Sequence, residues 1–428
     1  LMEEGAWGRL RSCEPPITVP AWQSMATSRN PGRLGLYGFR NRSGYGYDEM
    51  ATADGGAIRE PQVWRHLSRA RRKVIVLGVP QTYPPTPVNG ALVSCFLTPG
   101  PEAEYTYPPE LKTELLREGG YVIDVKDFRS DSKDALLAQL YAMTDNHFRL
   151  ARHLTRTRPW DFFMMVDMSV DRLHHGFWRF MDRGHRLHES GNPHEHAIRD
   201  FYMHTDRLVG ELIASFPPDT ATIVVSDHGA QRMVGGVCVN DWLVANGWLA
   251  LKEKPAKPGP LRTKDIDWTR TRAWASGGYY ARVFLNVAGR EPQGIVPKGD
   301  YERVRAELAA ALEAIPDEKG APIGTKAHRP EDLYPEVRGI APDLIVYFGD
   351  LTWRSIGSVG MDALHVFEND TGPDDANHAP YGVFLAKVPG SPARGELSGL
   401  QLMDIAPTVL DLLGEPVPPE MEGRVIAC

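Results

Sequence analysis

The chain has 428 residues, with 48 Lys and Arg against 55 Asp and Glu, which gives a formal charge of −7. Its hydrophobic fraction of 42% and charged fraction of 24% are those of a folded globular protein and exclude a disordered chain. The acidic balance argues against a binder of nucleic-acid polymers, and no apolar run approaches the ~18 residues of a membrane-spanning helix. At about 100–200 residues per domain, the length predicts one large α/β domain with an insertion, or two to three smaller domains.

The first residues and the cysteines bear on where the chain works. Leu1–Gly5 resembles the last turn of a helix, so we expect the chain to begin inside a fold, with any targeting segment upstream. The cysteines show no CxxC spacing and indicate no disulfide framework, which predicts a protein of the reducing cytoplasm. They are Cys13, Cys95, Cys238 and Cys428.

Short apolar runs recur along the chain and predict buried strands. Most are rich in Val, Ile and Phe without polar alternation, which is typical of strands covered on both faces. In chain order they are Val74–Leu77, Phe162–Val166, Thr222–Val225, Val283–Asn286, Leu344–Phe348 and Val383–Ala386.

Helical stretches lie between these runs. Over Tyr301–Ile315 the apolar residues fall on one face, and Asp300 is available as the N-cap. Leu402–Leu413 is followed by Gly414 and Pro416, which are usual signals for the end of a helix. The alternation of strands and helices predicts an α/β fold in which a mostly parallel central sheet carries helices on both faces.

Residues 231–340 interrupt this alternation. The stretch contains the Lys- and Pro-rich segment Lys252–Pro260 and a separate helix. We therefore expect an inserted cap subdomain over residues 231–340. The catalytic α/β domain is then expected over residues 1–230 and 341–428.

The first candidate for chemistry is a threonine near the start of the chain. Thr18 stands just before a helix whose first turn tolerates Pro20. A hydroxyl at that place faces the unpaired N–H groups and the positive dipole end of the helix, which is a natural seat for phosphate. A plain helix-capping or turn threonine is the alternative interpretation.

A second candidate follows the strand Phe162–Val166. Asp171 and His175 are four residues apart, so on a helix both project from one face and can share a metal. Ligands at the carboxyl end of a strand lie where open α/β sheets usually place their sites. Taken alone, an Asp-x-x-x-His spacing is a common coincidence.

Two further candidates lie close to strands. Asp227 and His228 come at the end of Thr222–Val225, and packing does not readily explain them because burying an unpaired carboxylate is costly. His378 lies in a predicted loop just before Val383–Ala386, where a solvated histidine is the alternative interpretation.

Taken together, these segments resemble the alkaline phosphatase superfamily, and within it the type I phosphodiesterase/nucleotide pyrophosphatase branch. The shared order is a Thr-x-Pro segment, an Asp-x-x-x-His, a Ser-Asp-His-Gly and a late His. The segments Tyr83–Pro85 and Asn240–Leu243 and the ending from Leu402 to Arg424 also resemble that branch. The resemblance extends over nearly the whole chain.

The resemblance implies two divalent metal ions about 4 Å apart, usually zinc. Manganese and iron are alternatives, because Asp and His side chains accept them as well. The threonine would attack phosphorus and become transiently phosphorylated. By position, one metal would be held by Asp171, His175 and His378, and the other by Thr18, Asp227 and His228.

Three departures from the family pattern matter. Nucleotide pyrophosphatases carry an Asn immediately after the Thr-x-Pro, where it holds a phosphate oxygen, whereas this chain has Ala21, so the resemblance does not extend to nucleotide specificity. The family supplies one further Asp to the Thr18 metal, from a first strand that ends in Asp-Gly, and we expect that strand upstream of Leu1. Sulfatases of the superfamily use a Cys-x-Pro-x-Arg segment, whereas Cys13–Ile17 lacks the Arg. A sulfatase is therefore not expected.

The sequence thus predicts a metal-dependent phosphoric ester hydrolase that acts on a small-molecule ester, with phosphodiesterase as the leading function. A phosphomonoesterase, a phosphonate monoester hydrolase and a phosphoryl transferase of the same superfamily are the alternatives. A metal-binding protein without catalysis is the alternative from another class. Oligomeric state is not predicted.

Overall fold

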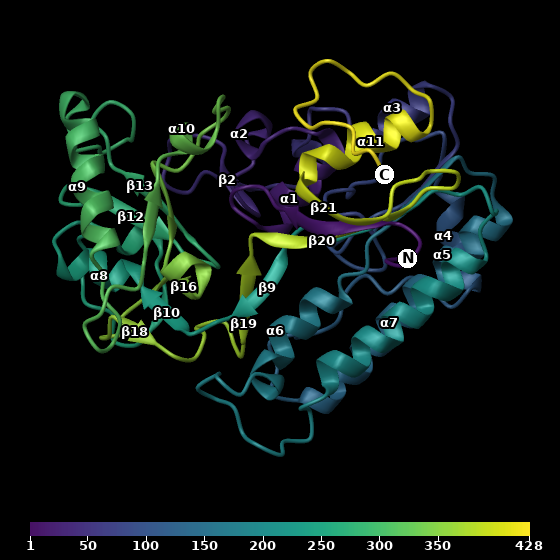
Figure 1. Cartoon of the computed structure of the whole chain (residues 1–428). Coiled ribbons are helices and arrows are strands. Elements are labelled where there is room, and N and C mark those ends of the chain that lie inside the picture. The colour runs from purple at the N-terminus through teal and green to yellow at the C-terminus, as the bar shows by residue number, and fades with distance from the viewer.

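Two four-stranded sheets form the centre of one lobe of this computed structural model, which describes residues 1–428 (Figure 1). β4 pairs in parallel with β5 and β7, and β1 with β21, whereas β20 runs antiparallel to β1 and β8. The predicted α/β class is confirmed, with parallel and antiparallel pairs in the same core. The first sheet has the order β21 (Gly395–Gln401), β1 (Ala6–Arg11), β20 (Tyr381–Lys387) and β8 (Thr222–Val225). The second has the order β6 (Thr106–Tyr107), β5 (Gly90–Val93), β4 (Val74–Leu77) and β7 (Phe162–Met165).

Helices cover both sides of the second sheet. Ile75 and Leu77 of β4 pack with residues of α4, α5 and α7, whereas Val74 and Val76 pack with residues of α1, α3 and α11. Alternate side chains of one strand therefore enter opposite cores, which explains its unbroken apolar run. The helices are α1 (Thr18–Thr27), α2 (Pro31–Leu34), α3 (Val63–Arg69), α4 (Glu110–Arg117), α5 (Lys133–Thr157), α6 (Ser169–Met181), α7 (Ala197–Ala214), α8 (Val239–Ala245), α9 (Tyr301–Glu313), α10 (Pro330–Leu333) and α11 (Ile405–Leu412).

The apolar runs predicted as strands are all strands, with bounds that differ from the prediction by a few residues at most. The predicted helix over 301–315 is α9. The predicted helix over 402–413 is a 3-10 turn, Leu402–Asp404, that leads directly into α11.

The strand β1 is one of the elements that no apolar run predicted. Met2–Glu4 form a turn, in which the Glu4 N–H donates to the Leu1 carbonyl at 3.2 Å, and the chain then enters β1 between β20 and β21. Buried and more exposed residues alternate along β1, so no continuous apolar run marks it as a strand.

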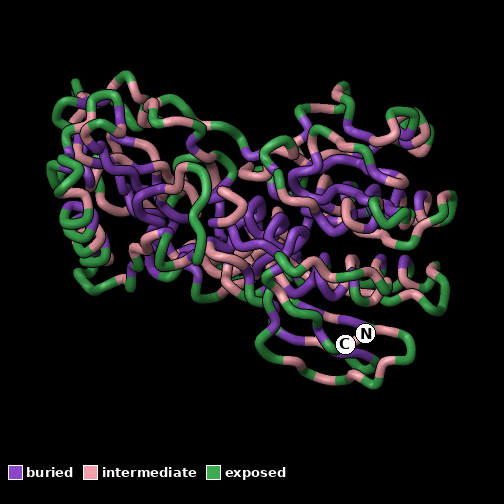
Figure 2. The backbone as a smooth tube through the Cα atoms, turned by 90° about the horizontal axis from the view of Figure 1, so that it is seen from above, coloured by how far each residue is buried: buried purple, intermediate pink, exposed green.

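The second lobe contains the inserted region and has its own core (Figure 2). Residues 341–428 are expected in the catalytic domain, but β15 and β16 pair with strands that lie within residues 231–340, so this sheet core extends past residue 340. An apolar run identifies a buried strand without identifying its partner, so the sequence does not fix this boundary. One sheet has the order β12 (Ala273–Ser276), β13 (Ala281–Leu285), β15 (Leu344–Tyr347) and β14 (Lys326–His328). Another has the order β16 (Trp353–Ile356), β10 (Gly235–Cys238) and β18 (His365–Val366).

Small two-stranded ladders complete the fold. One of them, β9 with β19, lies between the two lobes and carries a candidate ligand (Figure 1). The ladders are β9 (Gly229–Arg232) with β19 (Ala376–Ala379), β2 (Arg40–Arg42) with β3 (Met50–Thr52), and β11 (Gly259–Pro260) with β17 (Ser358–Val359).

All four cysteines are free. None of the helices combines the length and the hydropathy that crossing a membrane requires.

Candidate metal centre

Asp171 and His175 lie in the first two turns of α6, which begins shortly after β7. The helix start is fixed by Asp167, whose Oδ1 accepts hydrogen bonds from the Ser169 hydroxyl at 2.8 Å and the Ser169 N–H at 3.3 Å. Asp167 also accepts a bond from Thr144, so its carboxylate is already used in capping. The four-residue spacing then brings Asp171 and His175 to one face, as predicted.

His378 reaches the same place from β19. The sequence predicts a loop at this residue, but it lies in a strand whose partner is β9. His378 is opposite Ala230 in that ladder, two residues after His228, so the ladder brings two of the predicted motifs together. Its Nδ1 atom donates to the carbonyl of Pro16 at 2.8 Å, which orients the ring.

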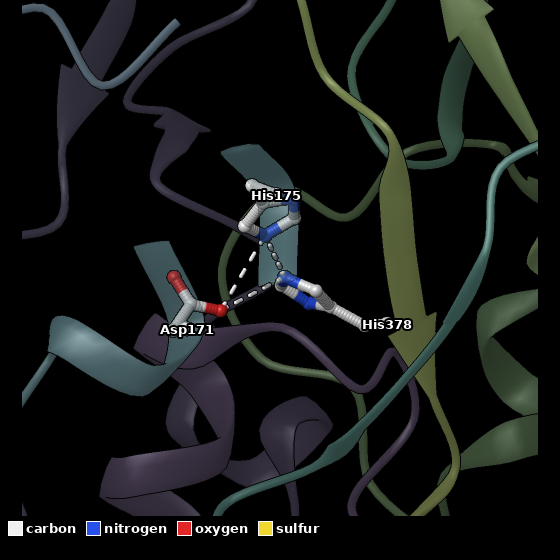
Figure 3. Close-up of side chains that lie close together, drawn as sticks. All are labelled: Asp171, His175 and His378. Carbon is white, nitrogen blue, oxygen red and sulfur yellow. Dashed lines mark hydrogen bonds and ion pairs between the residues drawn. The ribbon is translucent and has the colours of Figure 1, made fainter. Parts of the chain in front are cut away.

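The side chains of Asp171, His175 and His378 point toward one another (Figure 3). The two Nε2 atoms are 3.3 Å apart, and Asp171 Oδ1 lies 3.4 Å from Nε2 of His175 and 3.7 Å from Nε2 of His378. Ligand atoms bonded to one tetrahedral ion at about 2.0–2.2 Å lie about 3.3–3.6 Å from each other. The three atoms therefore already have the separations of a tetrahedral site.

The ring tautomers also favour a cation at this point. Nδ1 of His175 faces two acceptors at short distance, Asp374 Oδ1 at 2.8 Å and the Ala376 carbonyl at 2.9 Å, with the Tyr279 hydroxyl at 3.3 Å. Nδ1 of His378 faces the Pro16 carbonyl. Both Nδ1 atoms therefore carry the proton, and both Nε2 lone pairs face each other and a carboxylate. This arrangement needs a positive charge between the lone pairs, either a proton or a metal ion.

The pKa values of the three side chains also indicate a positive charge between them. Burial lowers the pKa of His175, but the carboxylates of Asp374 and Asp171 more than offset this and raise it to about 9. Burial acts upward on Asp171, yet the neighbouring His175 holds its pKa well below the usual value. Burial and His228 hold the pKa of His378 well below its usual value. Without metal, His175 therefore carries a second proton, on Nε2, in addition to the one on Nδ1.

Metal binding is expected to release that proton. Because the pKa of His175 is about 9, the proton is bound below this pH and must leave before Nε2 can ligate a metal. The apparent affinity for Zn²⁺ should thus rise with pH and level off near that pKa. Calorimetry in buffers of different ionisation enthalpy should show about one proton released per metal at this site at neutral pH. A proton release of zero there would contradict the assignment.

Asp227 and His228 lie directly beside the first cluster. The rings of His228 and His378 stack with centroids 3.7 Å apart. Nδ1 of His228 donates to the Gly229 carbonyl at 2.9 Å, so its Nε2 lone pair faces Asp227 Oδ2 at 3.2 Å. That oxygen is buried without a hydrogen-bond partner, and burial raises the pKa of Asp227 to about 6. The Nε2 lone pair of His228 and the Asp227 carboxylate would both be stabilised by a cation bound between them.

Thr18 is the first residue of α1, is 4% exposed, and follows an extended Ile17. Two residues before it, the carbonyl of Pro16 accepts from His378. Further upstream, the Ser12 hydroxyl donates to the Asp227 carbonyl. The segment that leads to Thr18 therefore contacts both other segments, whereas the group of side chains with metal-ligand separations contains only Asp171, His175 and His378.

Three residues around the histidines were not predicted. Tyr279 stacks on His175 with centroids 4.9 Å apart and lies 4.7 Å from the His378 ring. Asp374 accepts from His175, and Arg129 donates to Asp374 at 2.9 Å. Tyr279 and Arg129 stand in no motif. Only the adjacent pair Asp374 and Asp375, four and three residues before His378, offers a sequence signal.

Known proteins with a similar sequence or fold identify the family of this chain. A profile of the family "type I phosphodiesterase / nucleotide pyrophosphatase" matches residues 1–374. No curated protein matches the sequence.

Several solved structures share the fold. Phosphonoacetate hydrolase from Sinorhizobium meliloti 1021, in complex with phosphonoformate, has a TM-score of 0.61 at 16% identity, covering 96% of this chain and 88% of its own. Human ectonucleotide pyrophosphatase/phosphodiesterase 5 has a TM-score of 0.53 at 12% identity, covering 98% and 89%. The murine protein, as an inactive threonine-to-alanine variant in complex with AMP, has a TM-score of 0.50 at 12% identity, with the same coverage. The chain belongs to the type I phosphodiesterase/nucleotide pyrophosphatase family and is a phosphoric ester hydrolase.

Proposed function

We propose that this chain is a metal-dependent phosphodiesterase in which the Thr18 hydroxyl attacks phosphorus. The observation that carries the proposal is the cluster of Asp171, His175 and His378, whose ligand atoms lie 3.3 to 3.7 Å apart with both Nε2 lone pairs directed inward. The neighbouring Asp227 and His228 repeat the same pattern of a lone pair facing a carboxylate. The family supplies the reaction class, which is phosphoric ester hydrolysis.

Two divalent cations fit this donor set, one at Asp171, His175 and His378, and the other at Thr18, Asp227 and His228. Neutral imidazole nitrogens and carboxylate oxygens favour zinc, and manganese or iron are accepted by the same ligands. When bound, such ions lower the pKa of a coordinated hydroxyl and neutralise the charge on the phosphate oxygens.

The start of α1 supports the role of Thr18. The first helical bond runs from the Ala21 N–H to the Ile17 carbonyl at 2.9 Å, so the N–H groups of Thr18 and Val19 precede it and are free for a ligand. These N–H groups and the helix dipole favour a phosphate at this end. The inactive threonine-to-alanine variant of the murine relative, which holds AMP, supports a threonine nucleophile.

The proposed reaction is an in-line displacement at phosphorus in which each residue has a separate role. Thr18 loses its hydroxyl proton to solvent, its Oγ1 forms a bond to phosphorus, and the bond to the leaving alcohol breaks. The phosphorylated threonine is afterwards hydrolysed by water, which restores the hydroxyl. Asp171, His175 and His378 keep one fixed geometry throughout, since each histidine is held through Nδ1.

A substrate panel tests the proposed function. The full chain, stripped with chelator and reloaded with Zn²⁺ or Mn²⁺, is assayed on bis(p-nitrophenyl) phosphate, p-nitrophenyl phosphate and a p-nitrophenyl phosphonate ester. We expect metal-dependent hydrolysis with the highest kcat/KM on the diester. Preference for the monoester, for the phosphonate or for transfer to an added alcohol would instead establish a phosphomonoesterase, a phosphonate monoester hydrolase or a phosphoryl transferase. Metal binding without any turnover would leave only a metal-binding protein.

A further inference from the structure

Asp374 lies behind His175, on the side of the imidazole ring away from the ligand atom Nε2. Its Oδ1 accepts the Nδ1 proton of His175 at 2.8 Å, and its side chain is completely buried. Of the two Nδ1 atoms in the cluster of Asp171, His175 and His378, only that of His175 donates to a carboxylate. His378 uses the neutral carbonyl of Pro16 for the same purpose.

The buried carboxylate is held by cationic and phenolic groups from three separate segments. Arg129 Nε donates to Asp374 Oδ2 at 2.9 Å, and the Tyr279 hydroxyl donates to the same oxygen at 3.0 Å. Arg129 also donates to the Tyr279 hydroxyl at 2.9 Å, and Arg354 Nη1 lies 3.6 Å from Oδ2. Burying a carboxylate is costly unless it is paired. The contacts with Arg129, Tyr279 and Arg354 offset this cost and hold the Asp374 carboxylate in one position.

We propose that Asp374 is the positioning residue of the metal centre, which holds His175 in the Nδ1-protonated tautomer and aims its Nε2 at the metal. This inference rests on the function proposed above. A metal-bound histidine is generally oriented by a hydrogen bond from its second nitrogen, and a carboxylate at that place strengthens the ligand. Tyr279 adds to the effect, because its ring stacks on His175 and its hydroxyl fixes Asp374.

The inserted region therefore contributes to the metal centre from outside the ligand set. Tyr279 comes from the turn between β12 and β13, and Arg354 comes from β16. Both belong to the second lobe, whereas Asp171 and His175 lie on α6 of the first. The position of the second lobe is thus coupled, through Asp374, to the orientation of His175.

Asp374→Asn removes the charge with little change of shape. If the amide oxygen stays on His175, the amide NH₂ faces the donor Nε of Arg129, and if the amide flips, its NH₂ faces Nδ1 of His175. The flipped form favours the other tautomer, in which Nε2 carries the proton and cannot ligate a metal. Loss of such an orienting partner lowers metal affinity by about 10–100-fold.

Asp375→Asn is the matched control. Asp375 is the next residue, its side chain is 2% exposed, and it accepts from Arg179 Nε at 2.7 Å, so its substitution also breaks a buried arginine pair. It touches His175 only through the backbone, where the Asp375 N–H donates to the His175 carbonyl, and that bond remains.

The experiment compares the full-length wild type with both variants. Zn²⁺ affinity is measured by chelator competition, the visible spectrum is recorded with Co²⁺, and the His175 tautomer is read by long-range ¹H–¹⁵N correlation in metal-free protein. We expect Asp374→Asn to bind Zn²⁺ at least tenfold more weakly, with an altered Co²⁺ spectrum and a loss of Nδ1 protonation. Asp375→Asn should stay within about twofold of the wild type.

The results separate this inference from the proposed function. Equal Zn²⁺ affinity, Co²⁺ spectrum and tautomer in wild type and Asp374→Asn would overturn the role of Asp374 and leave the metal centre in place. A wild type that binds no metal would overturn the proposed function and this inference together. If Asp374→Asn does not fold, Tyr279→Phe serves as the second variant, since it keeps the stacked ring. It should weaken Zn²⁺ binding by about threefold to tenfold, and unchanged binding would again count against the proposal.

Discussion

Thr18→Ala is expected to abolish turnover while the metal site at Asp171, His175 and His378 stays intact. Without the hydroxyl, the chain has no group at the start of α1 to form the phosphoester, and loss of a nucleophile costs at least about 10³-fold in kcat. The three ligands of the first site do not depend on Thr18, and the helix start uses no side-chain cap at Ile17. The test is kcat on bis(p-nitrophenyl) phosphate together with the metal content and Tm of the variant.

Thr27→Ala is the control for this substitution. Thr27 is the last residue of the same helix, is 2% exposed, and donates its hydroxyl to the Gln23 carbonyl at 2.7 Å. Its replacement should cost about 1 kcal/mol of stability and leave kcat unchanged. Activity of Thr18→Ala within tenfold of the wild type would show that Thr18 is not the nucleophile.

Asp227→Asn is expected to stabilise the metal-free protein and to remove activity. Asp227 Oδ2 is buried without a partner, and burial raises the pKa from 3.8 to about 6. At pH 8 the folded state therefore holds a charge that the unfolded state accommodates more easily, which costs about 3 kcal/mol. The cost declines as the pH falls below the folded pKa of about 6 and disappears near the unfolded value of 3.8. Asparagine avoids it, but is a far weaker metal ligand, so the second metal and turnover are lost.

Asp167→Asn is expected to destabilise the metal-free protein and serves as the comparison for Asp227→Asn. Asp167 also follows a strand closely, but hydrogen bonds from His147, Thr144 and Ser169 outweigh burial and hold its pKa below the usual value. Neutralising it should lower the Tm of the metal-free protein at pH 8, whereas Asp227→Asn should raise it. Denaturation at pH 8 and pH 5 in chelator measures both effects. A lower Tm for Asp227→Asn at pH 8 would mean that Asp227 is not an unpaired charge.

Two of the candidate motifs follow elements that the sequence identifies easily. The apolar runs over 162–166 and 222–225 are strands, and Asp171 and His175, which follow the first of them, come together with His378. That these side chains, and Asp227 and His228 after the second strand, bind metal stays a prediction. Spacing alone placed Asp171 and His175 on one helix face. His378 needed the family resemblance, because no local pattern distinguishes a strand-borne ligand from a solvated histidine.

Other features depend on contacts between distant segments and could not be predicted in this way. β15 is an obvious strand, but its pairing with β13 and β14 depends on the whole second lobe. β1 has the alternation of a half-buried strand over a few residues only. Asp374 and Tyr279 act on His175 from a loop and from the other lobe, so neither has a fixed spacing to the motif that it supports.

The most direct test of the account is to look for the phosphorylated threonine during turnover. Metal-loaded wild type is mixed with bis(p-nitrophenyl) phosphate, quenched in acid within milliseconds and digested, and the peptides are analysed by mass spectrometry. The account predicts that the peptide containing Thr18 carries one p-nitrophenyl phosphate group in the wild type. Neither the chelator-stripped protein nor Thr18→Ala should carry it. Continuous turnover by the wild type with an unmodified Thr18 peptide and direct incorporation of solvent oxygen in a single step would contradict it.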